Sequence, residues 1–338
     1  MLSLAALLAS LALARPGPPV ARIALVPDTQ NYVTTIDAGD DAVRAKLLDA
    51  MVNDIVAYHP DFVLQVGDLT DSTGGPDQNG AARLADDPNH YGQPQDAEWA
   101  RIRQRMFDRL DAEGIPHFEV VGNHDSCVDF ERWFPARDFL ARPWGKDVDL
   151  RPKACGAGAV DTTHRQALFE TPIGTICVVG APFNQTDGDW PWIVSHLGCG
   201  AGRPTILVQH AGTYGPIAAA AQAEKDALVM VSNGHYTCTG CVMSRQSVVS
   251  NAGLSLITTF TDWQETSFGA PGGANHTGLS WWSSLEIDPK ANTSTILARN
   301  PYLGGIHDSP TPSAYRNAND SVPLPYDWCA KFGGAACP

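Results

Sequence analysis

The sequence is poor in basic residues and, past its first residues, has no long apolar run. Lysine and arginine together number 23 against 37 aspartates and glutamates, which gives a formal net charge of −14. Nucleic acids and anionic membranes are bound by clustered basic side chains, so this balance argues against both as partners. A bilayer-spanning helix needs a longer apolar stretch than any found after the N-terminus. We therefore expect no nucleic-acid partner and no membrane span.

The N-terminal apolar run covers residues 2–14 and ends in Ala12-Leu13-Ala14. The run is too short to span a membrane, and its A-x-A ending is typical of the cleavage site of a signal peptide. No Lys or Arg precedes the run, although signal peptides usually carry one there, and a buried N-terminal helix is the alternative. We expect a signal peptide over residues 1–14 and an exported mature protein, either secreted or periplasmic.

The mature chain, residues 15–338, shows no internal repeat and no linker, so we expect a single domain with a large core. Apolar runs rich in β-branched residues recur at 23–26, 62–66, 118–121, 175–179, 205–208, 228–231, 255–261, 284–287 and 295–298. Apolar residues at helical spacing predict helices over 42–58 and 98–112, between the early runs. This βαβαβ pattern predicts parallel strands, and after about residue 250 strand follows strand. The pattern predicts an α/β fold in which two packed mixed sheets are flanked by helices.

Residues 71–96 interrupt this pattern. Gly, Asp, Asn, Pro and Gln dominate the segment, and no periodicity is visible. Segments of this length without secondary structure are uncommon inside a domain and are often functional. We expect a long loop insertion here, in which His90 and Tyr91 either reach a substrate or only decorate the surface.

All eight cysteines lie in the mature chain, and an even count in an exported protein favours disulfides, although pairing cannot be read from sequence. Cys238 and Cys241 form a CxxC without a second such pair, so a local disulfide is preferred to a zinc ribbon. Cys177 lies in an apolar run and is expected to be a free buried thiol. The other pairs that we expect are Cys127 with Cys155, and Cys329 with Cys337 as a staple of the C-terminal tail.

The strongest signal is a set of short polar blocks, each placed where a predicted strand ends. The blocks are Asp28-Thr29-Gln30, Gly67-Asp68-Leu69-Thr70-Asp71, Gly122-Asn123-His124-Asp125 and Gly234-His235, with a lone His210 at the end of a further strand. Each block alone can be a turn or a capping segment. Strand ends meet at one edge of a sheet, however, where α/β folds build their sites. The mixture of Asp, Asn and His suits Mn, Fe or Zn rather than Ca²⁺.

Such a set of ligands suits the hydrolysis of phosphate esters. This reaction needs a nucleophile at neutral pH, neutralisation of charge on the phosphoryl oxygens, and a proton for the leaving group. Two metal ions about 3.5–4 Å apart meet the first two needs, because they lower the pKa of a bound water to about 7 and bind the oxygens. A carboxylate can bridge the two ions, and a nearby histidine can act as general acid.

In their order and spacing, the blocks resemble the motifs of the calcineurin-like metallophosphoesterases, which run D-x-H, GD-x-x-D, GNH-D/E, a lone His and GH-x-H. The resemblance covers roughly residues 22–240, and the combination of GD-x-x-D with GNHD is specific. It implies the four-layer α-β-β-α fold of that family. The Asp28-Thr29-Gln30 block resembles a branch of the family that uses Gln in place of the first His and looks like secreted phosphatases.

The resemblance also implies a set of metal ligands. They are Asp28 and Gln30 for a first ion, Asn123, His210 and His235 for a second ion, and Asp68 between the two. In the last block Thr237 replaces the family's final His, so the first site lacks imidazole twice and should bind borderline metal ions weakly. Three outcomes stay open. The first ion binds weakly and activity needs added Mn²⁺ or Mg²⁺; His276 or His307 completes the site; or the protein works with one ion or not at all.

The remaining implied roles concern catalysis and substrate. His124 is expected to act as general acid, with Asp125 orienting its imidazole, and Tyr32, Asn123 and His124 are expected to contact the substrate. We expect an exported metal-dependent phosphoesterase that hydrolyses phosphomonoesters, either small molecules or phosphoproteins, by attack of a metal-activated water. The alternatives are a phosphodiesterase of the same fold, a catalytically weakened relative that binds a phosphorylated ligand through one metal site, and a structural protein that only keeps the fold.

Overall fold

The computed structural model of the protein describes most of its central part. The described residues are 19–33, 41–70, 96–125, 127–148, 163–183, 189–210, 227–234, 245–249, 255–260, 280, 282–301, 305–306, 321–323 and 332. The expected signal peptide, the expected loop insertion up to residue 95, and the block that begins at His235 lie outside them. So do Thr237, His276, His307 and the cysteines of the C-terminal tail. Among the described residues, no helix has the length and apolar character that a membrane span requires.

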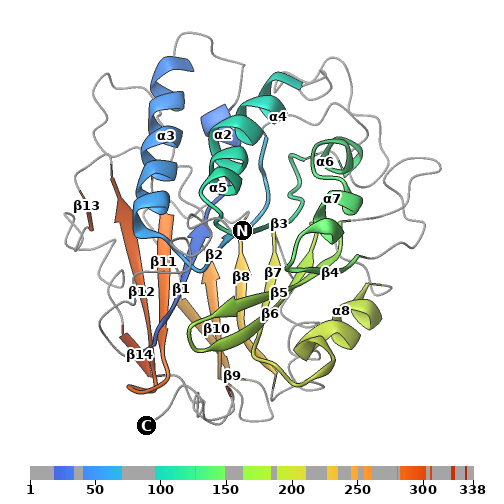
Figure 1. Cartoon of the computed structure of the whole chain (residues 1–338), viewed down its shortest axis with the longest axis vertical. Helices are drawn as coiled ribbons and strands as arrows, with labels where there is room; N and C mark the ends of the chain where they lie inside the picture. The colour runs from blue at the N-terminus through green and yellow to red at the C-terminus, as the bar shows by residue number, and fades with distance from the viewer. Residues whose placement is uncertain are drawn as a thin grey trace, which may run out of the picture.

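Two sheets form the centre of the molecule, each with seven strands among the described residues (Figure 1). The first sheet contains the parallel strands β1 (Ala21–Val26), β2 (Phe62–Gln65) and β3 (His117–Glu119), which are extended beyond β1 by antiparallel strands β11 (Trp282–Asp288), β12 (Thr293–Asn300), β13 (Gly305–Ile306) and β14 (Ser321–Pro323). The carboxyl ends of β1, β2 and β3 therefore lie at one edge of this sheet.

The second sheet has four parallel strands at its centre. They are β6 (Gly174–Ala181), β7 (Thr205–Gln209), β8 (Leu228–Asn233) and β10 (Ser255–Phe260), and they are flanked by antiparallel strands β4 (Gly145–Val148) and β5 (Arg165–Thr171) on one side and β9 (Arg245–Val249) on the other. The register places Ala181, Gln209 and Asn233 side by side. The residues that follow them, among them His210, therefore leave the sheet at the same edge.

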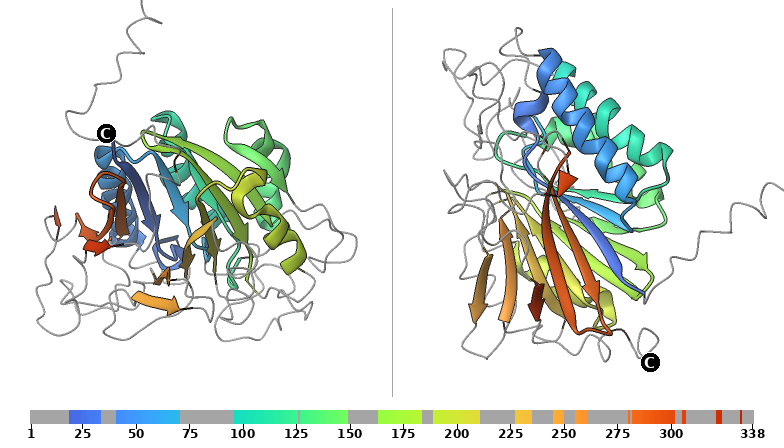
Figure 2. Two further views of the ribbon diagram at one scale, coloured as in Figure 1. Left: turned by 90° about the horizontal axis from the view of Figure 1, so that it is seen from below. Right: turned by 90° about the vertical axis from the view of Figure 1, so that its left-hand side faces the viewer.

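The two sheets pack face to face around a shared apolar core (Figure 2). Alternate residues of β1 point to opposite faces, so Ile23 and Leu25 enter this inter-sheet core whereas Ala24 and Val26 face the other way. Across the interface, Phe62 of the first sheet stacks on Phe169 of the second with ring centroids 4.3 Å apart.

Helices cover the outer face of each sheet. The first sheet packs against α2 (Gln30–Val33), α3 (Asp41–Tyr58), and the continuous rod of α4 (Asp96–Ile102), the π-helical turn η2 (Arg103–Phe107) and α5 (Asp108–Ala112), followed by α6 (Cys127–Trp133). The second sheet packs against α8 (Trp190–His196) and the short turn η3 (Leu197–Gly200), and α7 (Ala136–Ala141) precedes β4. The predicted α/β fold with two mixed sheets between helical layers is confirmed, and α3 and the α4–α5 rod match the two predicted helices closely.

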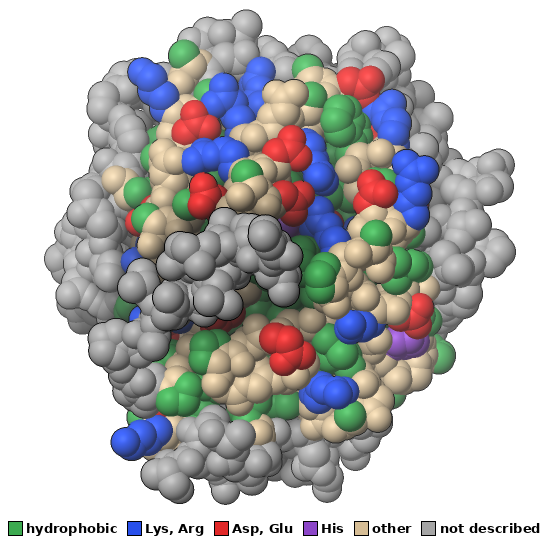
Figure 3. Space-filling model, in the orientation of Figure 1, with side chains coloured by type: hydrophobic (Ala, Val, Ile, Leu, Met, Phe, Trp, Pro, Cys, Tyr) green, Lys and Arg blue, Asp and Glu red, His purple; other side chains and the backbone are tan. Residues whose placement is uncertain are grey.

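Charged side chains of both signs are interspersed over these helices on the face shown in Figure 3. Arg103 lies 2.7 Å from Asp108, and Arg105 lies 2.7 Å from Asp49 on the neighbouring α3. Such exposed pairs contribute little stability each. They do show that the arginines of the α4–α5 rod are matched by carboxylates within the same surface.

The expectation of a free thiol at Cys177 is wrong. Cys177 of β6 forms a disulfide with Cys199 of η3, 22 residues further along the chain. Cys177 points to the outer face of the second sheet, where α8 and η3 pack. The sequence shows the apolar surroundings of Cys177, but the partner is brought to it only by the turn that follows α8.

A buried ionic network joins the two sheets close to the edge that carries the polar blocks. The guanidinium of Arg165, at the start of β5, lies 3.3 Å from Glu119 of β3 and between the rings of Phe130 and Phe139. Glu119 also lies 2.9 Å from His117 Nδ1. Burial alone would raise the pKa of Glu119, but the nearby His117 and Arg165 lower it overall. The carboxylate of Glu119 is therefore charged in the folded protein.

Candidate metal centre

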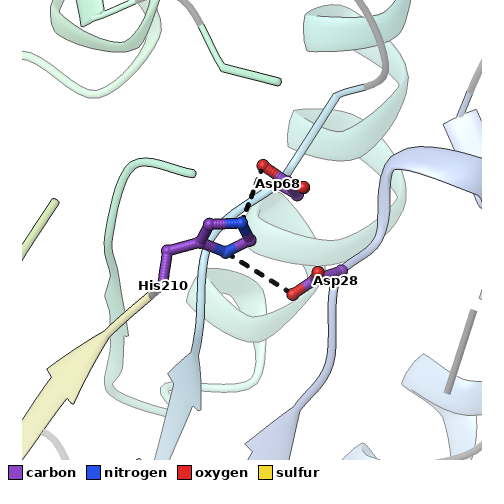
Figure 4. Close-up of side chains that lie close together, drawn as sticks. All are labelled: Asp28, Asp68 and His210. Carbon is purple, nitrogen blue, oxygen red and sulfur yellow. Dashed lines mark ion pairs between the residues drawn. The ribbon is translucent and has the colours of Figure 1, made fainter. Parts of the chain in front are cut away.

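Three of the predicted ligands meet in a buried cluster between the two sheets (Figure 4). Asp28 and Asp68 follow β1 and β2 of the first sheet, and His210 follows β7 of the second. The ligand atoms of all three lie within 4.8 Å of one another. His210 Nδ1 is 3.7 Å from Asp28 Oδ1, and His210 Nε2 is 3.2 Å from Asp68 Oδ1. Convergence of strand ends, as expected from the sequence, places these side chains together.

Asn123 completes this group from the end of β3. Its Oδ1 lies 2.8 Å from His210 Nε2. On the opposite side of the ring, His210 Nδ1 lies 3.0 Å from the carbonyl of Val66. Because a carbonyl can only accept a hydrogen bond, Nδ1 donates to Val66, and Nε2 is the nitrogen that faces the oxygens of Asp68 and Asn123 and would bind an ion in its deprotonated form. The imidazole is thus oriented with its coordinating atom toward the carboxylate and the amide oxygen.

The electrostatics of this cluster favour a cation. Burial by itself would lower the pKa of His210, but the Asp68 carboxylate and the hydrogen bonds around the ring raise it overall. Burial would likewise raise the pKa of Asp68, and its interactions with His210 and His124 lower it. Two buried carboxylates against a single imidazole leave an excess of negative charge, which is costly in the interior unless it is compensated. The donor set of carboxylate, imidazole and amide oxygen fits a divalent transition-metal ion.

Glycines of the motifs allow the loops to approach one another this closely. Gly67 has a φ of +103°, a conformation that other residues rarely adopt. A Cβ on Gly122 would lie 2.0 Å from Asp68 Oδ1, and a Cβ on Gly234 would lie 2.3 Å from Asp28 Oδ1. The GD, GN and GH pairs therefore each place a residue without a side chain directly against a ligand carboxylate or imidazole.

Main-chain hydrogen bonds tie the first two blocks together. The carbonyl of Asp68 accepts hydrogen bonds from the N–H groups of Thr29 and Gln30, both at 2.9 Å. Thr29 Oγ1 donates to the carbonyl of Leu69 at 3.2 Å. Asp68 itself has a φ of +50°, which is strained for a residue with a side chain and is typical of functional sites. Gln30 is buried, and its role as a ligand of a first ion stays a prediction.

The carboxylate of Asp125 has a different role from the one predicted. It accepts four hydrogen bonds, from the N–H groups of Leu69, Thr70 and Gly122 and from Thr70 Oγ1, at 2.9 to 3.2 Å. It therefore clamps the loop after β2 to the loop after β3, and none of these bonds involves the imidazole of His124. The sequence could not show this, because three of the four donors belong to a different block. Burial and the nearby Asp68 raise the pKa of Asp125 to about 6, against the lowering effect of the N–H donors.

His124, the predicted general acid, lies beside Asp68. Its N–H donates to Asp68 Oδ1 at 2.9 Å, and its Nε2 lies 4.0 Å from Asp68 Oδ2. The side chain is 18% exposed, so its imidazole is accessible at the rim of an otherwise buried cluster. The backbone bond fixes where the side chain begins, next to the carboxylate that is predicted to lie between the ions.

Tyr32 lies in the core instead of at the rim. Its side chain is 1% exposed and packs among the residues between the first sheet and its helices. Its hydroxyl accepts a hydrogen bond from the N–H of Ser280 at 3.2 Å. Packing accounts for this tyrosine, and its contact with a substrate stays a prediction. His235 is outside the described residues, but the N–H of Gly234 donates to the carbonyl of His210 at 3.0 Å, so the last block starts beside the cluster.

Two residues near the cluster were missed by the sequence reasoning. Phe183 follows β6, its ring lies 5.8 Å from that of His210, and its N–H donates to the carbonyl of Val121 at 3.0 Å. Gln65, the last residue of β2, is buried against the backbone of Gly67. Gln65 ends β2 and Phe183 follows β6, both at the edge of the sheets where the predicted ligands lie. The rule that sites form at strand ends could therefore have pointed to them.

Comparison with known proteins identifies the family of the chain. The family model of the calcineurin-like phosphoesterases matches residues 21–239. Among curated proteins no sequence matches the chain. Similar solved structures include a dimetal phosphatase from Danio rerio (14% identity, 84% of this chain and 97% of that one, TM-score 0.45) and a novel phosphatase from Mycoplasma pneumoniae (11% identity, 90% and 94%, TM-score 0.35). A hypothetical protein from Thermus thermophilus is also similar (13% identity, 78% and 92%, TM-score 0.40). On the strength of the sequence model, which spans all the strand-end blocks, the chain belongs to the calcineurin-like phosphoesterase family.

Proposed function

We propose that this chain is an exported, metal-dependent phosphoesterase that hydrolyses phosphomonoesters. The observation that supports it is the meeting of Asp28, Asp68, Asn123 and His210 at one strand edge, with the accessible His124 beside them. Family membership supports the reaction class. The substrates that we propose are small phosphorylated compounds or phosphoproteins.

Asp28, Asp68 and His210 fit a divalent ion, and we expect two ions, Mn, Fe or Zn, with a weaker first site. Asp28 and Gln30 would hold the first ion, Asn123, His210 and His235 the second, and Asp68 both. When bound, such ions neutralise phosphoryl oxygens and lower the pKa of water. Because Thr237 stands where the family has a further His, we expect the first ion to be lost easily and activity to depend on added metal.

The protein side chains supply position and a proton. Asp125 holds the loops after β2 and β3 together, so Asp68 and Asn123 keep their relative places. His124 holds the proton that the leaving oxygen requires, and its partial exposure lets an ester reach it. The ring of Phe183 lies edge-on to that of His210, with ring centroids 5.8 Å apart, and would help to keep water from this side of the imidazole.

Export is supported by the apolar N-terminal run and by the Cys177–Cys199 disulfide. Disulfides persist mainly in oxidising compartments such as the periplasm or the extracellular space. The test is expression of the full chain in a host with a secretory pathway, followed by N-terminal sequencing of the recovered protein. A mature N-terminus at residue 15 supports export, and recovery of the uncut chain in the cytoplasm contradicts it.

The activity is tested by hydrolysis of an aryl phosphate by the mature, oxidised protein loaded with Mn²⁺. Asn123→Ala should abolish turnover because it removes an oxygen 2.8 Å from His210 Nε2. Asn53→Ala, on the exposed side of α3, is the matched control and should leave turnover unchanged. If folded, Mn²⁺-loaded protein shows no turnover above Asn123→Ala, the proposal is wrong.

Two additional experiments separate the proposed function from a phosphodiesterase and from a catalytically weakened relative. An aryl phosphodiester turned over faster than the monoester would favour the diesterase reading of the same fold. Thr237→His restores the residue that the family has at this position. A large gain in rate from that substitution would favour the view that the natural chain is a weakened relative, and no gain would favour a working centre with the present ligands.

A further inference from the structure

Gln65 is a fully buried amide at the end of β2, two residues before Gly67. Its Oε1 accepts a hydrogen bond from the N–H of Gly67 at 2.8 Å, and its Nε2 donates to the carbonyl of the same residue at 2.6 Å. Nε2 also lies 3.5 Å from the carbonyl of Pro27, the residue before Asp28. One side chain thus reaches the backbone next to both carboxylates of the metal centre.

The local backbone explains why an amide is needed at this position. Gly67 and Asp68 have φ values of +103° and +50°, so the chain turns sharply out of the sheet and the polar groups of Gly67 cannot join a strand ladder. A buried polar group without a partner is costly, and a side-chain amide offers both a donor and an acceptor in the manner of a neighbouring strand. Among the side chains, only Gln and Asn carry a primary amide, which presents its donor and its acceptor on separate atoms side by side, and Asn is one methylene shorter.

We infer that Gln65 is a positioning residue of the metal centre: by binding both polar groups of Gly67, it sets the turn that directs the Asp68 carboxylate toward His210. Through Pro27 it also links this turn to the loop that carries Asp28. The inference rests on one part of the proposed function, the binding of a divalent ion by the centre. It concerns ion affinity first and hydrolysis second.

The test compares Gln65→Met with a matched variant elsewhere. Methionine keeps the length of the side chain but provides neither donor nor acceptor to Gly67. The control is Gln166→Met, because Gln166 of β5 is also buried and its amide donates to the main-chain carbonyl of His196 at 2.8 Å, on the side of the second sheet that packs against α8. Both variants lose buried hydrogen bonds to main chain, and urea unfolding measures how far each one is destabilised.

The measurement is Mn²⁺ affinity of the intact chain by titration calorimetry, with urea unfolding of the metal-free protein alongside. We expect Gln65→Met to bind Mn²⁺ roughly 10- to 100-fold more weakly than wild type, as for other residues that orient metal ligands. Gln166→Met should stay within about twofold of wild type. Gln65→Glu should also bind weakly, because a carboxylate cannot donate to the Gly67 carbonyl, and it serves as second variant if Gln65→Met does not fold.

Equal Mn²⁺ affinity in Gln65→Met and Gln166→Met would overturn the inference, even if both are destabilised. A wild type that binds Mn²⁺ but hydrolyses no ester, with weakened binding in the Gln65 variants, would support the inference while the proposed function fails. Normal hydrolysis by the Gln65 variants at limiting Mn²⁺ would support the function and overturn the inference. A wild type that does not bind Mn²⁺ overturns both.

Discussion

Removal of the Cys177–Cys199 disulfide should lower the stability of the fold by about 3 kcal/mol. The cross-link closes a loop with a sequence separation of 22 residues. The chain-entropy relation for a loop of this length gives roughly 3 kcal/mol at 25 °C. At roughly 2–4 °C per kcal/mol, this corresponds to a fall in melting temperature of roughly 6–12 °C.

The position of the disulfide separates stability from function. Cys177 is aligned with Thr205 at the start of β7, whereas His210 follows the far end of the same strand. The disulfide holds η3 and α8 against the second sheet, and no ligand of the metal centre comes from these elements. Below the melting transition we therefore expect unchanged Mn²⁺ affinity and turnover.

The assay is thermal unfolding of the double variant Cys177→Ala/Cys199→Ser beside Val194→Ala. Val194 lies on α8 and packs against the same cluster, so its substitution removes packing without affecting the cross-link. A melting temperature no lower than that of Val194→Ala would show that packing, and not the cross-link, holds this segment. A loss of Mn²⁺ affinity would refute the separation of the disulfide from the centre.

Three further predictions concern the centre and its support. Gly122→Ala should weaken Mn²⁺ binding at least tenfold, because the new Cβ would lie 2.1 Å from the main-chain nitrogen of Asp68. The control Gly114→Ala, whose Cβ would meet nothing within 4 Å, should leave the Mn²⁺ affinity unchanged. Equal affinities of the two variants would contradict the close-packing argument. Asp125→Asn should lower the free energy of unfolding of the Mn²⁺-loaded protein, measured with urea, by about 2–4 kcal/mol, because the new NH₂ group would face two hydrogen-bond donors. An unchanged free energy of unfolding would show that Asp125 does not hold the two loops together. Because the pKa of Glu119 is lower in the folded protein than its ordinary value of 4.5, Glu119 should stabilise the fold at pH values above 4.5. This contribution should disappear as the pH falls through the lowered pKa of the folded protein. Glu119→Gln should remove that part of the pH dependence of the urea midpoint, and an unchanged profile would refute the assignment.

The sequence predicted the layers and the meeting of the strand-end blocks for the same physical reason. Parallel strands bring their carboxyl ends to one edge, so Asp28, Asp68 and His210 could be placed together without knowledge of any contact. Helical periodicity gave the segment 42–58, which the structure extends by a single residue to Asp41. These features depend on periodicity and on order along the chain, both of which are visible in a single sequence.

The remaining features depend on partners distant in sequence. Asp125 was assigned to its neighbour His124, but its carboxylate binds the backbone of Leu69 and Thr70. Tyr32 is predicted to contact the substrate, which stays a prediction, and the sequence does not show that its hydroxyl accepts a hydrogen bond from Ser280 in the core. The disulfide partner of Cys177 likewise comes from a turn whose position only the packing of α8 decides. A motif locates a residue along the chain and leaves the direction of its side chain open.

The ion pair between Arg165 and Glu119 has a mechanical consequence for the centre. Asp28, Asp68 and Asn123 come from the first sheet and His210 from the second, so the ligands are held together only while the two sheets keep their alignment. A slip of one residue between the sheets would move His210 by about 3.3 Å relative to Asp68. This shift is as large as the 3.2 Å that separates His210 Nε2 from Asp68 Oδ1, so the two side chains would no longer share an ion. Arg165 and Glu119 join the sheets near the same edge. Sliding of one sheet past the other would separate these two buried charges, so the ion pair resists shear between the sheets.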